Sequence, residues 1–153
     1  MYQDFARDVR VAAAPDAVWN ALLDVQRVAS WLSIVRNVEE REPLRRYGAM
    51  LEDRVGPFAM RADLDVTVAA DAEARRLQVT AAGEDRQIAS RITASVDLVV
   101  SPDGPGAALA MTGRYEITGK IATLGAGAIR KKGEKVLDEF FANVARELAL
   151  ERS

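Results

Sequence analysis

Apolar and polar residues alternate over much of this chain, which is the pattern of strands that bury one face and expose the other. Runs of this kind cover residues 5–11, 58–68, 77–83, 88–100 and 109–117. Turn-forming residues separate the runs, most clearly in the segment 101–106, Ser-Pro-Asp-Gly-Pro-Gly. Parallel strands would need crossover helices between them and two apolar faces. We therefore predict about seven strands in a single antiparallel sheet.

Helical spacing of apolar residues appears on both sides of this strand region. Pro15 suits the first turn of a short helix over 15–23, and a second short helix is expected over 25–32. Over 119–148 the apolar period is helical again, which predicts a long C-terminal helix. Only this helix is long enough to cover the apolar face of the sheet. The expected fold is α+β: a curved seven-stranded antiparallel sheet wrapped around one helix, in a single domain over residues 1–153.

The composition removes most of the common catalytic devices. The 153 residues include no cysteine and no histidine, which excludes disulfides, thiolate nucleophiles, Cys or His metal sites and imidazole acid–base chemistry. The net charge is -2, so no overall positive field attracts nucleic acid. The chain start lacks the apolar core of a signal peptide, and no run approaches the ~18 apolar residues of a membrane span. We expect a cytoplasmic protein with no metal, no cofactor, no assigned catalytic residue and no nucleic-acid partner.

Several short motifs resemble those of a known family. They are Ala14-Pro15, Val18-Trp19, Leu22-Leu23-Asp24, Val55-Gly56-Pro57, Pro102-Asp103-Gly104, Gly119-Lys120-Ile121-Ala122-Thr123-Leu124-Gly125 and Phe140-Phe141. Together they make the chain similar to the CoxG-like branch, named for a carbon monoxide dehydrogenase subunit, of the START-like, or SRPBCC, polyketide cyclase-like superfamily. The resemblance implies a helix-grip fold like that of Bet v 1, a bound lipid-like or quinone-like molecule, and association with a membrane-linked redox enzyme.

The chain departs from the family pattern at the segment after the second short helix and at Glu84-Asp85-Arg86-Gln87, where members have a Gly-rich segment before the sixth strand. Members usually carry a Cys-Ile-Pro-Gly-like tetrapeptide after the second short helix, where this chain has Trp31-Leu32-Ser33-Ile34. This variant is nearer to the polyketide cyclase and dehydrase relatives. The architecture, the small inward residues and the lack of a convincing catalytic set nevertheless favour a protein that binds or transfers a hydrophobic molecule as the leading hypothesis; the alternative is an enzyme acting on an aromatic or polyketide substrate.

The interior of the predicted fold is the first candidate site. Small residues occupy the inward positions Ala62, Ala81, Gly83, Ala94 and Gly113, which leaves room beside their larger neighbours. An apolar ligand in that space is one explanation, and a close approach of helix and sheet is the other. The predicted ligand contacts are Trp31, Leu32, Phe58, Met60, Leu64, Leu77, Val79, Ile88, Ile92, Met111, Tyr115, Ile121, Leu124, Val136 and Phe140.

Polar residues at inward positions are the second candidate. Arg7, Asp53 and Ser90 occupy inward positions in strands whose other inward residues are apolar. A charge buried there needs a partner. Arg7 with Asp53 would form a head-group site at one end of the pocket, and Tyr115 with Lys120 would orient a ligand carbonyl. In an enzyme these groups would polarise a carbonyl and move a proton. The competing explanation is a solvated strand end or a one-residue bulge.

Glycines at 119, 125, 127 and 133 stand before and within the long helix. Each glycine inside a helix costs about 1 kcal/mol relative to alanine, so their number calls for an explanation. Either they keep the first turns thin above a pocket entrance, or residues 120–127 form a separate turn and the long helix begins after it.

Arg130, Lys131, Lys132 and Lys135 form a basic cluster in a chain that is acidic overall. Such a cluster would make peripheral contact with an anionic membrane surface. The simpler explanation is a solvated helix face, on which neighbouring acidic residues partly neutralise the cations.

Overall fold

Seven strands form one antiparallel sheet in the computed structural model, which describes the backbone of residues 2–152 and the side chains of residues 2–148. The strands are β1 (Tyr2–Val11), β2 (Val35–Glu42), β3 (Arg46–Val55), β4 (Phe58–Asp71), β5 (Arg76–Asp85), β6 (Ser90–Asp103) and β7 (Gly106–Gly119). Their order across the sheet is β1-β7-β6-β5-β4-β3-β2, so strands β2 to β7 follow one another as a meander. The first strand closes the far edge by pairing with the last one.

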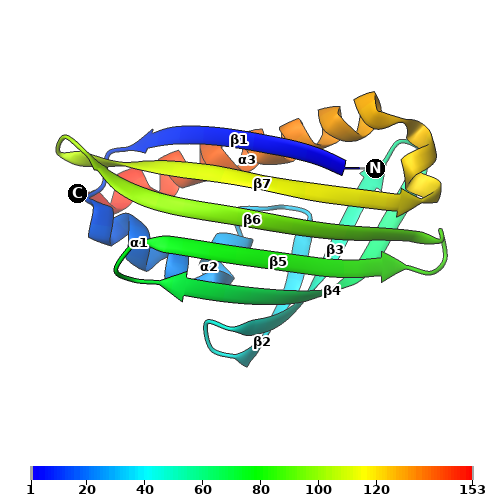
Figure 1. Cartoon of the computed structure of the whole chain (residues 1–153), viewed down its shortest axis with the longest axis horizontal. Coiled ribbons are helices and arrows are strands. Elements are labelled where there is room, and N and C mark those ends of the chain that lie inside the picture. The colour runs from blue at the N-terminus through cyan, green and yellow to red at the C-terminus, as the bar shows by residue number, and fades with distance from the viewer. Residues whose placement is uncertain (1, 153) are drawn as a thin grey trace.

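Three α-helices and one 3-10 helix complete the fold. They are α1 (Pro15–Leu23), α2 (Val25–Ala29), the 3-10 helix η1 (Lys120–Leu124) and α3 (Ala126–Arg152). Figure 1 shows α3 running behind β1 and β7 along the length of the sheet, with α1 and α2 on the same side. The predicted helix-grip fold is confirmed. The second short helix ends at Ala29, earlier than expected, and a turn over 120–124 precedes the long helix.

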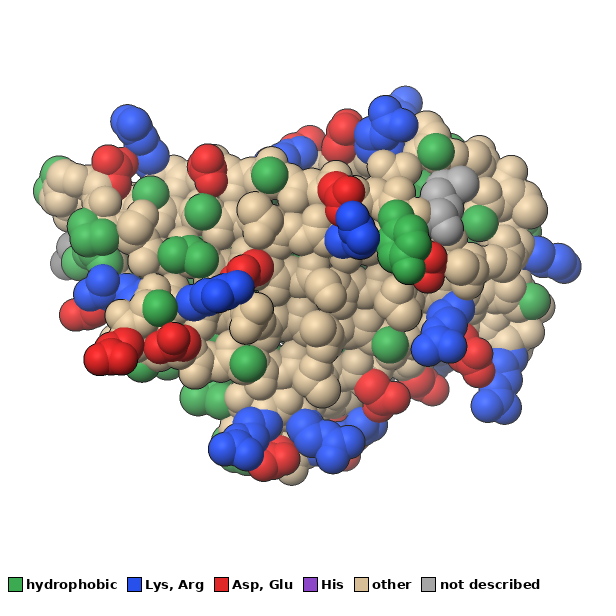
Figure 2. Space-filling view, in the orientation of Figure 1, with side chains coloured by type: hydrophobic (Ala, Val, Ile, Leu, Met, Phe, Trp, Pro, Cys, Tyr) green, Lys and Arg blue, Asp and Glu red, His purple; other side chains and the backbone are tan. Residues whose placement is uncertain are grey.

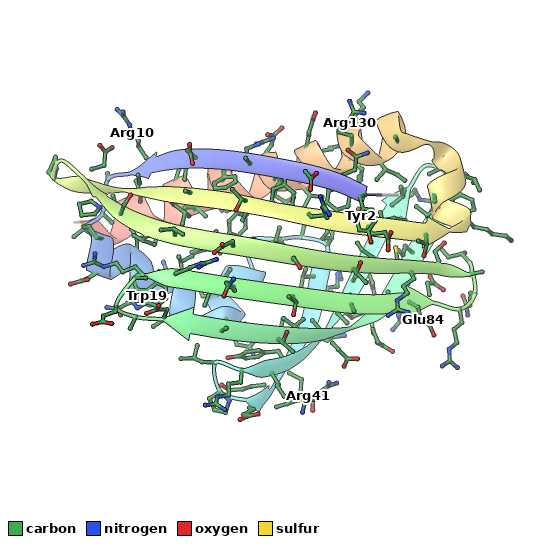
Figure 3. The ribbon with its side chains drawn as sticks, viewed as in Figure 1. Tyr2, Arg10, Trp19, Arg41, Glu84 and Arg130 are labelled. Atoms are coloured by element: carbon green, nitrogen blue, oxygen red, sulfur yellow. The ribbon has the colours of Figure 1, made fainter. Side chains whose placement is uncertain are left out.

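The inner face of the sheet packs into two hydrophobic clusters. The first joins α1 to the C-terminal half of α3 and contains Val18, Leu22, Val144 and Leu148, all of them fully buried. The second lies toward the start of α3 and contains the buried residues Leu51, Met60, Ala62, Ile117, Ile121 and Ile129. Figure 3 labels Trp19 on α1 and Arg130 on α3, which lie toward opposite ends of the molecule.

The outer face of the sheet is polar and carries mainly small side chains. In Figure 2 the middle of this face has few large side chains, and charged ones gather along its margins. Thr80, Ala82, Thr93 and Ser95 line a hollow of about 420 Å³ there, beside Arg114. This face matches the outward positions of the predicted alternation, because successive side chains of a strand point to opposite sides of its sheet.

Candidate functional site

An apolar cavity of about 340 Å³ lies between the inner face of the sheet and α3. The walls come from β1, β3 to β7, α2 with the segment that follows it, and α3. The lining residues are Phe5, Val28, Leu32, Ile34, Leu51, Asp53, Val55, Met60, Val79, Ile92, Ala94, Val96, Leu98, Met111, Tyr115, Ile117, Ile129, Lys132, Gly133, Val136, Leu137 and Phe140.

The cavity separates the two hydrophobic clusters. Leu98, Met111 and Phe140 belong to the first cluster, while Met60 and Ile129 belong to the second, and all five line the cavity. Close-packed interiors normally leave few voids larger than a water molecule, so a volume of this size is a distinct feature of the fold. Its surface is formed by apolar atoms, which makes it suited to an apolar guest.

One ion pair lies in the wall. Lys132 of α3 places its ammonium nitrogen Nζ 2.9 Å from Oδ1 of Asp53 on β3. The Asp53 side chain is 16% exposed and that of Lys132 is 29% exposed, so the pair is largely shielded from solvent but still reaches it. Such a pair marks the part of the wall where the cavity meets the surface, because charged groups keep contact with water.

Tyr115 of β7 spans from the sheet to α3. Its hydroxyl donates a hydrogen bond to the backbone carbonyl of Ile129 at 3.2 Å. Partial burial raises the pKa of this phenol, the nearby negative charge of Glu134 raises it further, and Arg130 partly opposes the shift. The tyrosine fits against α3 because residue 133 is glycine: a Cβ there would overlap the Tyr115 hydroxyl oxygen. This contact gives one of the helical glycines a packing role.

Two further polar links hold α3 to the segment that follows α2. Glu139 accepts a hydrogen bond from the backbone N–H of Ser33 at 2.6 Å and another from the Ser33 hydroxyl at 2.9 Å. The amide of Asn143 donates to the backbone carbonyl of Trp31 at 2.8 Å. Positions 132, 139 and 143 share one face of the helix, since residues seven and eleven apart lie nearly above one another. One helix face therefore carries all three links across this side of the cavity.

About half of the residues predicted as ligand contacts line the cavity. They are Leu32, Met60, Val79, Ile92, Met111, Tyr115, Val136 and Phe140. The others lie in packed regions beside it: Trp31 and Leu77 in the first cluster, and Leu64, Ile121, Phe58, Ile88 and Leu124 in or against the second. Inward orientation alone does not separate the two groups, because packed and cavity-lining residues occupy the same face of the sheet.

The predicted polar pairs do not form. Arg7 binds Asp138 and the backbone carbonyl of Glu134 on α3, so it does not meet Asp53. Lys120 is exposed on η1 and is absent from the cavity wall, where only Tyr115 of the second predicted pair appears. Arg7, Asp53 and Tyr115 each contact a residue of α3 instead of the predicted partner. Lys120 is exposed to solvent.

Ser90 has a structural role in the described fold. It is 3% exposed, and its hydroxyl accepts a hydrogen bond from the backbone N–H of Ile121 and donates one to the carbonyl of Ile88, both at 3.0 Å. It thereby fixes η1 to the start of β6 rather than contributing to the cavity wall.

Lys132 is the functional candidate that the sequence interpretation placed wrongly. It was grouped with an exposed basic cluster, but its ammonium turns to Asp53, whereas Arg130, Lys131 and Lys135 are exposed. A signal was present in the sequence, since Lys132 lies three residues after Ile129 and four before Val136, on the apolar stripe of the helix. The remaining lining residues that were not named carry no signal beyond apolar character and inward position.

Two classes of feature are absent from the residues that the structure describes. None of the described helices is long and apolar enough to cross a membrane. Within the same part of the chain, no cluster of acidic side chains is arranged to hold a metal ion.

An antiparallel sheet that grips a C-terminal helix over an apolar cavity defines a helix-grip protein, a ligand-binding scaffold. The model of the CoxG family of carbon monoxide dehydrogenase subunits matches residues 8–149. The chain therefore belongs to the CoxG family.

Solved structures with the same fold are distant in sequence. A conserved protein from Geobacillus kaustophilus superposes with a TM-score of 0.85 at 16% identity, covering 99% of this chain and 98% of that one. A protein from Thermus thermophilus has a TM-score of 0.74 at 17% identity, with 99% and 100% covered. Truncated norcoclaurine synthase from Thalictrum flavum has a TM-score of 0.63 at 12% identity, with 94% and 93% covered. A comparison with curated proteins finds no match.

Proposed function

We propose that this protein binds or transfers a hydrophobic small molecule, lipid-like or quinone-like, in the cavity between the sheet and α3. The observation that carries the proposal is the cavity itself, about 340 Å³ with an apolar surface. Ligand sites in proteins generally measure about 300–1,000 Å³ and are mostly apolar. An alkyl chain gains about 0.8 kcal/mol for each CH₂ group that it buries, so an elongated apolar molecule has a clear driving force to enter.

The proposed entrance lies on the side where α3 faces β3 and the segment after α2. Polar side chains link the two there, among them the Lys132–Asp53 pair and Glu139, which accepts two hydrogen bonds from Ser33. Polar links at a solvated boundary open at little net cost, because water replaces each lost hydrogen bond. A ligand entering here would pass between them into the apolar interior.

Native mass spectrometry of protein purified from its own host tests the proposal. We expect a species heavier than the bare chain, which loses the added mass after organic extraction. The extracted protein should then take up a fluorescent fatty-chain probe and release it to unlabelled competitors. A single unliganded mass together with no probe binding would refute the proposal.

A pair of matched substitutions locates the site. Ala94→Leu fills the cavity from β6, whereas Ala69→Leu adds the same side chain to an exposed position on β4. We expect the first to weaken probe binding at least about tenfold, since a leucine takes up space that the ligand needs. The second should leave binding unchanged. Equal behaviour of the two variants would place the probe elsewhere.

We further propose an oxidoreductase as partner, in the cytoplasm, with the chain acting as one domain. The support is the family, whose name describes a component of carbon monoxide dehydrogenase. Arg130, Lys131 and Lys135 remain an exposed basic group for an anionic membrane surface nearby. Affinity purification from the native host, followed by mass spectrometry, should recover an oxidoreductase. Recovery of none would refute the partnership and leave ligand binding untouched.

The enzyme alternative has less support. Of the four groups considered for proton transfer, Asp53 and Tyr115 line the cavity, while Arg7 and Lys120 do not. Asp53 pairs with Lys132, and the Tyr115 hydroxyl already donates to a helix carbonyl. A general acid or base must reach the reacting atom within hydrogen-bond distance. Of the four groups only Asp53 keeps an unengaged oxygen at the wall, and no second group of the four stands beside it to share the proton transfer.

A further inference from the structure

The Asp53–Lys132 pair makes the cavity wall electrically neutral. The two charges lie 2.9 Å apart, and Tyr115 has its hydroxyl bonded to the carbonyl of Ile129. Among the lining residues that the structure describes, no other side chain carries a charge. The cavity surface itself is apolar, so it is the end of a ligand at the mouth of the cavity that meets this pair, a positive and a negative group that already compensate each other.

The same pair still has capacity to bind a ligand. Oδ1 of Asp53 accepts a hydrogen bond from the backbone N–H of Arg54 at 2.8 Å and lies 2.9 Å from the ammonium nitrogen of Lys132, with which it forms an ion pair. Oδ2 has no hydrogen-bond partner among the described residues, and the ammonium group has three donors with one acceptor engaged. Asp53 can therefore accept a further hydrogen bond while Lys132 donates one, without separating the two charges.

We propose that the Asp53–Lys132 pair makes the cavity selective for neutral amphiphiles, molecules with an apolar chain and one uncharged hydrogen-bonding end. This inference rests on the proposed function and names the ligand class of the same site. A hydroxyl or carbonyl end accepts from Lys132, and a hydroxyl also donates to Oδ2 of Asp53. A carboxylate or ammonium end brings a charge with no free counter-charge, and a shielded unpaired charge is costly.

Three probes with the same alkyl chain test the inference: dodecanol, dodecanoate and dodecylammonium. Binding is measured by isothermal titration calorimetry on the full chain after extraction. The wild type should bind dodecanol at least about tenfold more tightly than either ion. Asp53→Asn leaves Lys132 without its counter-charge, so binding of dodecanoate should strengthen at least about tenfold. Lys132→Gln leaves Asp53 unpaired, so binding of dodecylammonium should strengthen similarly.

Two controls separate charge selection from general damage. The double variant Asp53→Lys with Lys132→Asp exchanges the two charges and keeps the pair neutral, so the preference for dodecanol should return. Asp138→Asn removes an acidic charge from the same helix, but Asp138 binds Arg7 outside the cavity wall and is 68% exposed. This variant should keep the wild-type ranking. Circular dichroism of each variant checks folding, and either single variant suffices if the other is unfolded.

Two outcomes count against the inference and differ in what they refute. If the wild type binds dodecanol but neither single variant gains affinity for its ion, the charge pair does not select ligands while the proposed function stands. If the wild type binds none of the three probes in the cavity, the proposed function fails and the inference fails with it.

Discussion

Replacing Gly133 with alanine tests the contact by which Tyr115 joins the sheet to α3. A Cβ at this position would overlap the tyrosine hydroxyl oxygen and lie 3.0 Å from Cζ. Tyr115 would have to withdraw from the helix and give up its hydrogen bond to the carbonyl of Ile129. The substitution therefore sets a gain in helix propensity against a loss of packing.

The magnitudes predict that the loss is larger. Alanine stabilises a helix interior by about 1 kcal/mol relative to glycine. Against this, overpacking costs about 1–3 kcal/mol, and the lost hydrogen bond costs about 1 kcal/mol. We expect Gly133→Ala to lower the free energy of unfolding by about 1–3 kcal/mol, which corresponds to a decrease in Tm of about 3–9 °C for a chain of this size.

Urea unfolding followed by circular dichroism measures the change, and Gly127→Ala is the matched control. No atom lies within 4 Å of the Cβ position at residue 127, so alanine there should leave stability unchanged or raise it by up to about 1 kcal/mol. In the Tyr115→Phe background the overlap with the hydroxyl is gone, and Gly133→Ala should cost less than in the wild type. If Gly133→Ala stabilises the protein as Gly127→Ala does, the packing argument is wrong.

Two other predictions concern single groups. Ser90→Ala should lower the free energy of unfolding by about 1–3 kcal/mol, because the backbone N–H of Ile121 loses its buried acceptor; an unchanged urea midpoint would contradict this. The pKa of Tyr115 is raised in the folded protein, so its contribution to stability is complete below its ordinary pKa of 10.0 and declines as the pH rises above it. The wild type should therefore lose more stability than Tyr115→Phe between neutral pH and pH above 10.0, and parallel curves for the two proteins would exclude the effect.

The strands and their faces could be predicted because their pattern is local. The alternation from Phe58 to Val68 follows the side-chain period of a strand, and the structure buries the same alternate positions in β4. The helix boundaries were less accurate. The turn after Gly119 and the start of α3 at Ala126 depend on how Ser90 and Gly125 hold η1, which involves contacts far apart in the chain.

The residues of the candidate site, too, were predicted where a local pattern determines them and missed where contacts between distant segments do. Inward position identified Tyr115, Asp53 and fewer than half of the other apolar residues of the wall, because the face of a strand is a property of its own sequence. Inward position could not identify the residues with which Arg7 and Asp53 form ion pairs. Arg7 meets Asp138, and Asp53 meets Lys132, across more than seventy residues of chain in each case.

Local sequence patterns are enough to define the family, the order of elements and the side of the sheet that is apolar, since each depends on short motifs or on a repeat of two or 3.6 residues. Where packing is complete and where a cavity remains is a property of the tertiary structure. It depends on the position of α3 over the sheet, which brings Gly133 against Tyr115 and turns Lys132 from an apparent surface cation into the partner of Asp53.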